Sequence, residues 1–556
     1  MKQEIKKIIE KVLIELQKDL GDFKIPEILV EIPKSLEHGD YSTNISMILA
    51  KELRKNPNEI ANLIKEKIIN FKEISKIEVI GGFINFYISD KYIVENIKKI
   101  NKDFGKNNNL KNKKVILDYT DPNPFKEFHI GHLMSNAIGE SLSRLFEFQG
   151  AKVKRVCYQG DVGIHVAKAI WGKLNNKKLK WPQAYAFGAQ NFEESEKAKN
   201  EITDLNKIIY EKSDKKINKL YDQGKKESLK YFDNIYKKLG TKFDWLIFEG
   251  QTGPLGKKIA EQAFKNEVLE KGEGGAIIFK GEKYGLHTRV FINSMGIPTY
   301  EAKDFGLAKI KYQKFAYDKS IVITGNEINE YFKVMLKAME QILPDLAKKT
   351  FHIGHGMLRL PEGKMSSRTG KVITGESLIN QLQEMVLEKI KDRKLSQKDK
   401  KIISEKVAIS AIKYSVLKQS AGSDIIYDFN KSVSFNGDSG PYLQYSFTRA
   451  LSVLEKSKSK KIKASFKNIP EKIGQLEKMM IQFPEVVERS AIEYQPHYVA
   501  TYLTQLASCF NSFYAQEQIV NKEDKFSPYK IAVTQAFVNI MQNGLWLLGI
   551  STLKKM

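Results

Sequence analysis

The sequence has few cysteines and no long apolar run. Cys157 and Cys509 are its only cysteines in 556 residues, which excludes a disulfide framework and a cysteine-rich zinc site and favours a reducing compartment. Apolar stretches such as Leu545 to Ile550 are far shorter than the roughly 20 residues of a transmembrane helix. We therefore expect neither a membrane-spanning helix nor a structural metal.

The first residues also lack the features of a targeting segment. They read MKQEIKKIIEKVLIELQKDL, with Glu and Lys at helical spacing instead of an uninterrupted apolar core and a small-residue cleavage site. Together with the low cysteine content, this pattern predicts a cytoplasmic protein. Because 42% of the residues are hydrophobic, the chain has enough apolar surface to fold, and intrinsic disorder is excluded.

Acidic residues are in the minority. The chain carries 91 Lys and Arg against 66 Asp and Glu, a formal net charge of +25. Such an excess attracts polyanions such as nucleic acids. A lysine-rich solvated surface would give the same count, so charge alone leaves both interpretations open.

Changes of pattern along the chain indicate several domains, as its length also suggests. Residues 1–105 are predicted to form a small α/β domain, with a helix near 43–54 and strands within 77–88 around two glycines. An Asn- and Lys-rich stretch at 101–114 is typical of a linker. Residues 377–556 lose strand signals and are predicted to form an all-α helical bundle.

Residues 106–376 between them are predicted to form a doubly wound α/β domain with a parallel sheet. Dense charges at helical periods predict a polar helical insertion at about 172–268 between two halves of that sheet. Five short β-rich runs are the expected strands: 115–120, 153–161, 275–281, 288–294 and 320–325.

A phosphate site is predicted where the first of these strands gives way to a helix. The tetrapeptide His129-Ile130-Gly131-His132 precedes an apolar stripe at helical spacing. Anions bind at the positive end of a helix dipole, and residues three apart lie on one helical face. A second HIGH tetrapeptide, His352 to His355, is followed by glycines and Pro361, so we interpret it as a strand with a turn after it.

A basic, glycine-flanked loop, LRLPEGKMSSRTGKVIT, follows in the second half. Such a loop is suited to close on phosphate oxygens, although alone it would be interpreted as solvated. Paired with the first HIGH, it resembles the KMSKS element of class I aminoacyl-tRNA synthetases.

Longer and more specific motifs, spread over nearly the whole chain, resemble those of arginyl-tRNA synthetases. They include PNPFKEFHIGHLMS, GLHTRVFINSMGIPTYEAKDFGLA, FNGDSGPYLQYSFTRALSVL, HGDYSTNISMILAK and GGFINFYIS. The resemblance implies a Rossmann-type catalytic domain, an N-terminal module that reads the D-loop region of tRNA and a C-terminal anticodon-binding domain. It implies arginine activation by ATP with Mg²⁺, then transfer to the terminal adenosine of tRNA(Arg), and activation that requires bound tRNA. We expect a monomer.

The resemblance also assigns site residues. For catalysis and ATP binding they are Lys126, His129, Gly131, His132, Lys364, Met365, Ser366 and Ser367, and for arginine they are Asp118, Asn123, His132, Tyr300 and Asp304. Carboxylates suit a guanidinium, which is always charged and presents a planar fork of donors. Asp118 as a strand-end cap and Tyr300 as a core residue remain alternatives, and the glutamine usual near Ile328 is absent.

The KMS loop departs from the family pattern because Ser367 stands where a second lysine is usual. Lys126, three residues before the first HIGH histidine, is predicted to supply the missing charge. Arg368 and Lys371 in the loop are the alternatives.

The predicted RNA contacts are Asn85, Phe86, Tyr442, Tyr445 and Arg449, since unpaired bases stack on aromatic rings beside basic residues. Two other functions are alternatives. A small nucleotidyltransferase would have no use for a basic helical domain. An inactive, RNA-binding synthetase paralogue would be expected to lose HIGH or pocket residues that this chain keeps.

Overall fold

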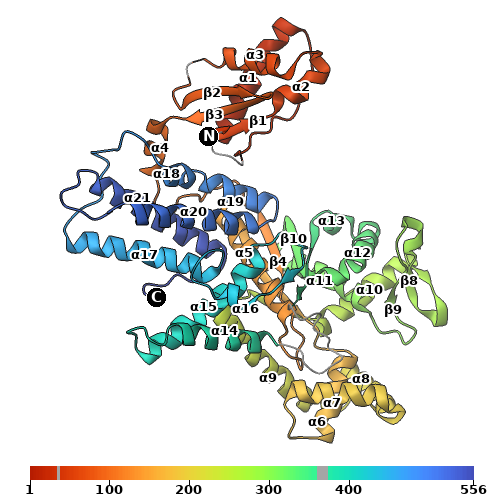
Figure 1. Cartoon of the computed structure of the whole chain (residues 1–556). Helices are drawn as coiled ribbons and strands as arrows, with labels where there is room; N and C mark the ends of the chain where they lie inside the picture. Colours follow the sequence, from red (N-terminus) through yellow and green to blue (C-terminus); the bar gives the residue numbers. More distant parts are fainter. Residues whose placement is uncertain (34–37, 70, 360–373) are drawn as a thin grey trace. The chain divides into compact units, whose positions relative to one another are not determined.

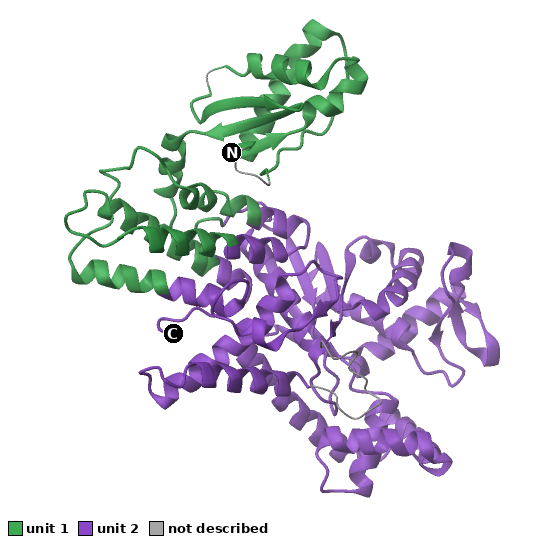
Figure 2. Ribbon diagram, viewed as in Figure 1, with its two compact units in different colours: residues 1–105, 449–486, 505–543 green, residues 106–448, 487–504, 544–556 purple. Residues whose placement is uncertain are grey.

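The computed structural model describes residues 1–33, 38–69, 71–359 and 374–556. They form two compact units, coloured in Figure 2. The first unit contains residues 1–105, 449–486 and 505–543, and the second contains residues 106–448, 487–504 and 544–556. No described helix is long and apolar enough to cross a membrane.

The N-terminal part of the first unit is an α/β fold, as expected. A three-stranded antiparallel sheet of order β1-β3-β2 packs with helices. Gly81 and Gly82 both have positive φ, 57° and 83°, which suits the tight turn between β2 and β3. The elements are α1 Lys2–Leu20, β1 Tyr41–Thr43, α2 Ile45–Leu53, α3 Pro57–Lys67, β2 Ile74–Ile80, β3 Phe83–Ile88 and α4 Asp90–Ile97.

Helices make up the C-terminal part of the chain. Four of them are divided between the two units, and Phe510 stacks on Phe537 in the first unit at 4.0 Å between ring centroids. The helices are α17 Gly440–Ser459, α18 Gln475–Met480, α19 Phe483–Ile492, α20 His497–Gln516 and α21 Ser527–Leu547.

A five-stranded parallel sheet organises the second unit (Figure 1). Its order is β11-β10-β4-β5-β6, so the chain reverses direction across the sheet between β4 and β10. Ligands of doubly wound sheets bind at the carboxyl ends of the strands beside such a switch point. The strands are β4 Lys114–Asp118, β5 Lys152–Gln159, β6 Trp245–Phe248, β10 Lys319–Gly325 and β11 Thr350–His355.

Helices follow the strands of this sheet, and three further helices, α14 to α16, and a two-stranded pair lie after it in the chain. The helices are α5 Ile130–Phe148, α10 Glu249–Lys265, α11 Tyr300–Phe315, α12 Asn329–Ile342, α13 Pro344–Ala347, α14 Gly375–Lys389, α15 Gln397–Leu417 and α16 Phe429–Ser432, with a 3₁₀ turn η4 at Asn326–Ile328. The pair is β12 Leu358–Arg359 and β13 Ile425–Ile426.

Two expected strands do not belong to the parallel sheet. The runs at 275–281 and 288–294 form β8 Ile277–Phe279 and β9 Arg289–Ile292, which pair antiparallel with β7 Glu270–Lys271. The prediction of parallel strands was wrong here because a parallel neighbour needs a crossover of a dozen or more residues, and these segments are too close in sequence. The 3₁₀ turns η2 Glu273–Gly275 and η3 Gly281–Tyr284 lie in their connections.

The helical insertion is shorter than predicted. It consists of α6 Ile164–Asn175, α7 Trp181–Glu194, α8 Glu196–Glu211 and α9 Lys215–Leu239, which Figure 1 shows gathered at one end of the second unit. The range 172–268 also contains β6 and α10, and β6 pairs with β5 in the main sheet. Its four apolar residues, WLIF, were hidden among dense charges.

Candidate functional site

The turn between β4 and α5 has a strained backbone. Thr120, Asp121 and Phe125 have positive φ values of 80°, 45° and 71°, a region that costs a non-glycine residue of order 1–3 kcal/mol. Hydrogen bonds hold the turn: the Tyr158 N–H donates to Asp121 Oδ1 at 2.7 Å, and the Phe125 N–H donates to Ser228 Oγ at 2.9 Å. Strain held by surrounding structure is typical of functional sites.

The first HIGH tetrapeptide begins helix α5, as predicted. His129 is its N-cap residue, and its N–H donates to Nδ1 of His132 at 3.1 Å. The two rings stack with centroids 3.5 Å apart. Burial lowers the pKa of His132 well below its usual value, so the ring is neutral near pH 7 and offers one donor and one acceptor.

Gly131 lies against the His129 ring. A Cβ at this position would approach that ring to 3.1 Å, so a side chain would press on the histidine stack. The second HIGH forms strand β11, as predicted, and His352 stacks on Phe332 at 3.8 Å.

The C-terminal end of the basic loop contacts the start of the first HIGH tetrapeptide. Thr374 forms a β-bridge with His129, and the Gly375 N–H donates to the carbonyl of Phe128 at 2.6 Å. The other end follows β12. Lys364, Met365, Ser366, Ser367, Arg368 and Lys371 lie outside the described residues.

Lys126 lies beside the histidines. Its Nζ is 4.7 Å from the ring centroid of Tyr185 in α7. Its positive charge contributes to lowering the pKa of both His129 and His132, after the larger effect of burial. The lysine is therefore close enough to act on an anion at the start of α5.

Asp118 and Asp304 approach the same site from different elements. Asp118, at the end of β4, is 1% exposed, and its Oδ2 pairs with Lys311 Nζ at 2.9 Å. Its Oδ1 has no partner among the described residues. Asp304 of α11 accepts a hydrogen bond from the Tyr331 hydroxyl at 2.6 Å, and burial raises its pKa to about 7.

Asn123 and Tyr300 lie at the edge of this group. Asn123 Oδ1 accepts a hydrogen bond from the Gly160 N–H at 2.9 Å, which leaves its Nδ2 as a donor. Tyr300 is 58% exposed at the start of α11, so it is not a core residue. Its ring centroid is 5.2 Å from Lys303 Nζ.

Comparison with known proteins gives this site a family. Residues 94–429 match the model of the class I tRNA synthetase (R) catalytic domain, residues 443–556 the DALR anticodon-binding domain, and residues 3–88 the arginyl-tRNA synthetase N-terminal domain. The chain belongs to the class I arginyl-tRNA synthetases.

Curated relatives of this synthetase match along its length. It is 29% identical to the arginine–tRNA ligase of Clostridium perfringens, covering 98% of this chain and 100% of the relative. It is 30% identical to that of Fusobacterium nucleatum, covering 96% of each. The solved arginyl-tRNA synthetases of Thermus thermophilus (TM-score 0.82, 20% identity, covering 100% of each chain) and Plasmodium falciparum (TM-score 0.81, 22% identity, covering 100% and 99%) share its fold.

Two buried lysines that lie among the predicted arginine-binding residues were not predicted from the sequence. Lys311 pairs with Asp118, and Lys303 Nζ lies 2.7 Å from Glu249 Oε2. Lys311 is 2% exposed and Lys303 is 5% exposed. Both lysines lie on α11 at helical spacing from its predicted arginine-binding residues: Lys303 follows Tyr300 by one turn, and Lys311 follows Asp304 by two turns. This spacing is the sequence feature that could have identified them.

The pocket as a whole is acidic. Four carboxylates and two ammonium groups interact across it, which favours a cationic ligand. Burial and the charge of Asp118 raise the pKa of Asp121 well above its usual value. The carboxylates are Asp118, Asp121, Glu249 and Asp304, and the ammonium groups belong to Lys303 and Lys311.

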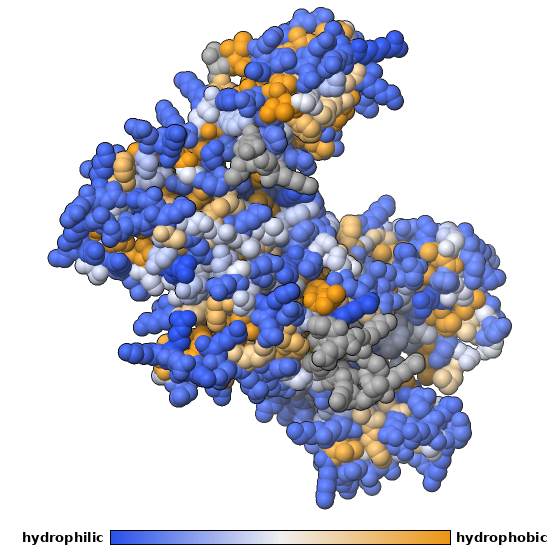
Figure 3. Space-filling view, viewed as in Figure 1, coloured by the Kyte–Doolittle hydropathy of each residue, from blue (hydrophilic) through white to orange (hydrophobic). Residues whose placement is uncertain are grey.

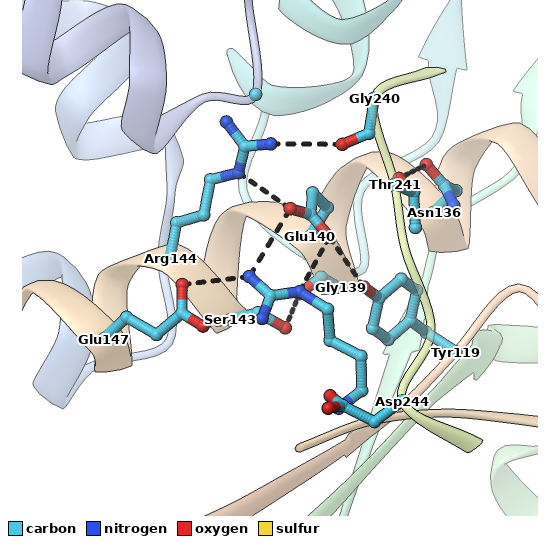
Figure 4. Close-up of polar contacts among 12 residues, drawn as sticks. Tyr119, Asn136, Gly139, Glu140, Ser143, Arg144, Glu147, Gly240, Thr241 and Asp244 are labelled. Atoms are coloured by element: carbon cyan, nitrogen blue, oxygen red, sulfur yellow. Dashed lines mark hydrogen bonds and ion pairs between the residues drawn. The ribbon is translucent and has the colours of Figure 1, made fainter. Parts of the chain in front are cut away.

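A buried polar network links Tyr119, next to Asp118 in the chain, to helix α5 (Figure 4). The hydroxyl of Tyr119, the residue after Asp118, donates to Glu140 Oε2 of α5 at 2.8 Å. Arg144 and Arg155 also donate to Glu140, at 2.7 and 3.0 Å from their Nε atoms. A Cβ at Gly139 would lie 2.2 Å from the Tyr119 ring, so only glycine admits this ring against α5.

The predicted RNA-contact residues of the N-terminal sheet are buried. Phe86 is 0% exposed and Asn85 is 2% exposed, which contradicts a stacking role for Phe86. Phe83, on the same strand, is 43% exposed. Hydrophilic residues cover most of the face in Figure 3.

In the helical part, Tyr442 and Tyr445 lie half-buried in α17. Arg449 of the same helix donates to Asn511 Oδ1 at 2.6 Å and lies 5.0 Å from the Tyr514 ring. These side chains are therefore held by the helices around them, and part of each tyrosine remains accessible.

Proposed function

We propose that the chain joins arginine to the terminal adenosine of an arginine tRNA, with the chemistry located between the β4 end, the start of α5 and α11. The observation that carries the proposal is the meeting of HIGH and the returning basic loop at one strand end, bridged at His129 and Thr374. The acidic pocket lies at the same strand end, where Asp118 terminates β4.

In the first step the carboxylate of arginine attacks the α-phosphorus of ATP, an arginyl-adenylate forms, and pyrophosphate leaves. Catalysis is mainly positioning and stabilisation of charge. His129, His132 and the free N–H groups of α5 hold the nucleotide, and Gly131 admits it close to the backbone. Lys126 stabilises charge on the leaving phosphates together with the loop residues Lys364, Met365, Ser366 and Ser367. Mg²⁺ travels with the phosphates of ATP.

Asp118 and Asp304 are proposed to bind the guanidinium, with Tyr300 at its edge. Asp118 Oδ1, buried and without a partner among the described residues, supports this role because an unsatisfied carboxylate oxygen is costly without a ligand. Asn123 and His132 are proposed to bind the amino and carboxylate end of arginine.

In the second step a ribose hydroxyl of the tRNA, the 2′ hydroxyl by class, attacks the adenylate carbonyl and AMP leaves. Residues 377–556 are proposed to bind the anticodon region, with Tyr442, Tyr445 and Arg449 as contact candidates, and residues 1–105 the D-loop region. We further propose that the enzyme acts as a monomer in the cytoplasm and needs tRNA for activation.

ATP–pyrophosphate exchange with each amino acid, with and without total tRNA, tests the proposal. Among the amino acids, only arginine is expected to support exchange, and it should do so only when tRNA is present. A nucleotidyltransferase would not depend on an amino acid and tRNA together, and an inactive paralogue would show no exchange. Absence of exchange with every amino acid in the presence of tRNA would overturn the proposal.

A further inference from the structure

The hydroxyl of Tyr331 is a feature of the pocket that the proposed reaction does not use. Tyr331 lies on α12, and its hydroxyl donates to Asp304 Oδ2 on α11 at 2.6 Å. Hydrogen bonds of this length to a carboxylate are charge-assisted and stronger than neutral ones. Within the described residues, no hydrogen bond reaches the other oxygen, Oδ1. Tyr331 therefore occupies one oxygen of Asp304 and leaves the other for a ligand.

The tyrosine ring is held in place by its neighbours. Phe332 packs edge-on against it at 5.3 Å between centroids, and the Arg289 guanidinium lies 5.5 Å from the ring centroid. Arg289 is in turn 3.8 Å from Glu301. A cation over a phenol ring favours the donation of its proton, because the ring loses electron density toward the cation. The donor is therefore fixed and polarised toward Asp304.

Asp304 needs such a donor because its surroundings disfavour ionisation. Charged and titratable groups from every element around the pocket face it: Asp118, Asp121, Tyr158, Glu249, Lys311 and Tyr331. Burial and the nearby carboxylates Glu249 and Asp118 raise its pKa, whereas Tyr331 and Lys311 oppose that rise. A protonated Asp304 could not form an ion pair with a guanidinium.

We infer that Tyr331 is a positioning residue that keeps Asp304 ionised and oriented, and that it thereby sets the preference of the pocket for a charged side chain over a neutral one of the same shape. The inference rests on the proposed role of Asp304 in binding arginine. Tyr331 stands three positions after Ile328, where the sequence lacks the expected glutamine. Ile328, in η4, is apolar and 37% exposed, so Tyr331 is the polar side chain that this segment contributes to Asp304.

A comparison of arginine with citrulline distinguishes this role from one in which Tyr331 only packs between helices. Citrulline has the shape of arginine but a neutral urea group, so its binding depends far less on the charge of Asp304. For Tyr331→Phe, kcat/KM for arginine in tRNA-dependent exchange is expected to fall about 10-fold or more near pH 7. The inhibition constant of citrulline is expected to change less than about twofold. Because a reduced folded fraction would lower the apparent kcat/KM but not the inhibition constant, kcat/KM is normalised to active enzyme by active-site titration. The KM for arginine, which does not depend on enzyme concentration, is compared as well.

The pH profile gives a second readout. Arginine binds to ionised Asp304, so its kcat/KM is full above the pKa of this group and is lost as pH falls through it. Removal of the Tyr331 hydrogen bond raises that pKa further, so the variant should lose arginine use at a higher pH than the wild type and recover it at alkaline pH. Tyr312→Phe is the matched control, because the Tyr312 hydroxyl accepts from Lys349 at 3.4 Å, outside the pocket.

Three outcomes decide between the proposals. The double variant Tyr331→Phe with Asp304→Asn should be no worse than Asp304→Asn alone, because Tyr331 acts through Asp304. If Asp304→Asn itself leaves arginine use unchanged, the proposed pocket is wrong. If Asp304→Asn is damaging but Tyr331→Phe keeps the wild-type pH profile, or weakens arginine and citrulline equally, the inference about Tyr331 is wrong and the pocket stands.

Discussion

At the scale of residues, the pocket contains more buried carboxylates than ammonium groups. Asp118 pairs with Lys311, and Glu249 pairs with Lys303, whereas among the described residues Asp304 has the Tyr331 hydroxyl as its hydrogen-bond partner. A buried charge without an ionic partner is the costliest of these to maintain. Asp304 therefore depends more on a cationic ligand than Asp118 and Glu249 do.

Replacement of Asp304 by Asn should raise the KM for arginine far more than the KM for ATP. Loss of one partner of a buried charge pair costs about 2 to 5 kcal/mol, which corresponds to roughly 30-fold to several thousand-fold. Steady-state exchange assays with arginine and ATP varied in turn measure both constants. An arginine KM within about twofold of the wild-type value would remove Asp304 from the pocket.

Replacement of Lys126 by Ala should lower kcat for tRNA-dependent exchange about 10²-fold or more, with the arginine KM nearly unchanged. The reason is its position in the strained, hydrogen-bonded turn before α5, where a fixed cation stabilises charge that develops on the leaving phosphates. Ser367→Lys in the same chain should restore part of the loss. Damage from Arg368→Ala instead, with Lys126→Ala active, would show that the loop supplies the charge.

At the scale of elements, helix α5 connects the proposed nucleotide site to the proposed arginine pocket. Its N-terminus carries HIGH, and its buried polar face holds the Tyr119 hydroxyl through Glu140, next to Asp118 in the chain. A helix with apolar residues on one side only normally exposes its polar side, so these buried polar contacts would not be expected from such a pattern. In α5 the polar side is also buried, including Asn136 and Ser141, both 0% exposed.

The close approach of α5 and Tyr119 gives a testable consequence. Gly139→Ala would place a methyl group 2.2 Å from the Tyr119 ring, so the ring must move, and overpacking of this kind typically costs about 1–3 kcal/mol. We expect a lower thermal midpoint and weaker arginine use, because Tyr119 adjoins Asp118.

Ser141→Ala in the same helix is the matched control for Gly139→Ala. Ser141 Oγ is buried without a hydrogen-bond partner among the described residues, so its removal should leave stability unchanged or raise it. Calorimetry of the two variants beside the wild type makes the comparison. Equal stability of Gly139→Ala and the wild type would contradict the packing argument.

At the scale of the whole molecule, the sheet unit includes residues from the end of the chain. Residues 544–556 belong to it: Arg144 donates to the Trp546 carbonyl at 2.8 Å, and buried Lys413 donates to the Gly549 carbonyl at 2.7 Å. A chain that ends near residue 400 would leave Arg144 without this acceptor and would lack Lys413 itself. The role of the helical domain in RNA binding is therefore best tested in the full chain.

Affinity for tRNA should fall steeply as salt concentration rises. With a formal net charge of +25, Lys and Arg contacts to phosphates would release counterions, which makes the logarithm of affinity fall linearly with the logarithm of salt concentration. Filter binding or fluorescence titration of the full chain at several salt concentrations measures the slope. A tRNA affinity independent of salt would show that the positive charge lies away from the RNA.

The sequence alone predicted the parts of the site that are local in the chain. A strand, a turn with two prolines, HIGH and an amphipathic helix follow one another within 115–148, and neighbouring residues dictate that order. The second HIGH was also identified as a strand, because glycine and proline after it prevent a helix. The family resemblance was carried by motifs of the same local kind.

Only the tertiary structure decided which charges face one another. Lys311 and Asp118 are 193 positions apart, and Tyr331 meets Asp304 from another helix. For β8 and β9, the short spacing in sequence already disfavours parallel pairing with each other, whereas their place in a sheet apart from the main one was decided by packing. Burial of Phe86 instead of Phe83 was likewise decided by which strand face the helices cover. Local pattern determines the type of an element, whereas its partners depend on packing between segments that are distant in sequence.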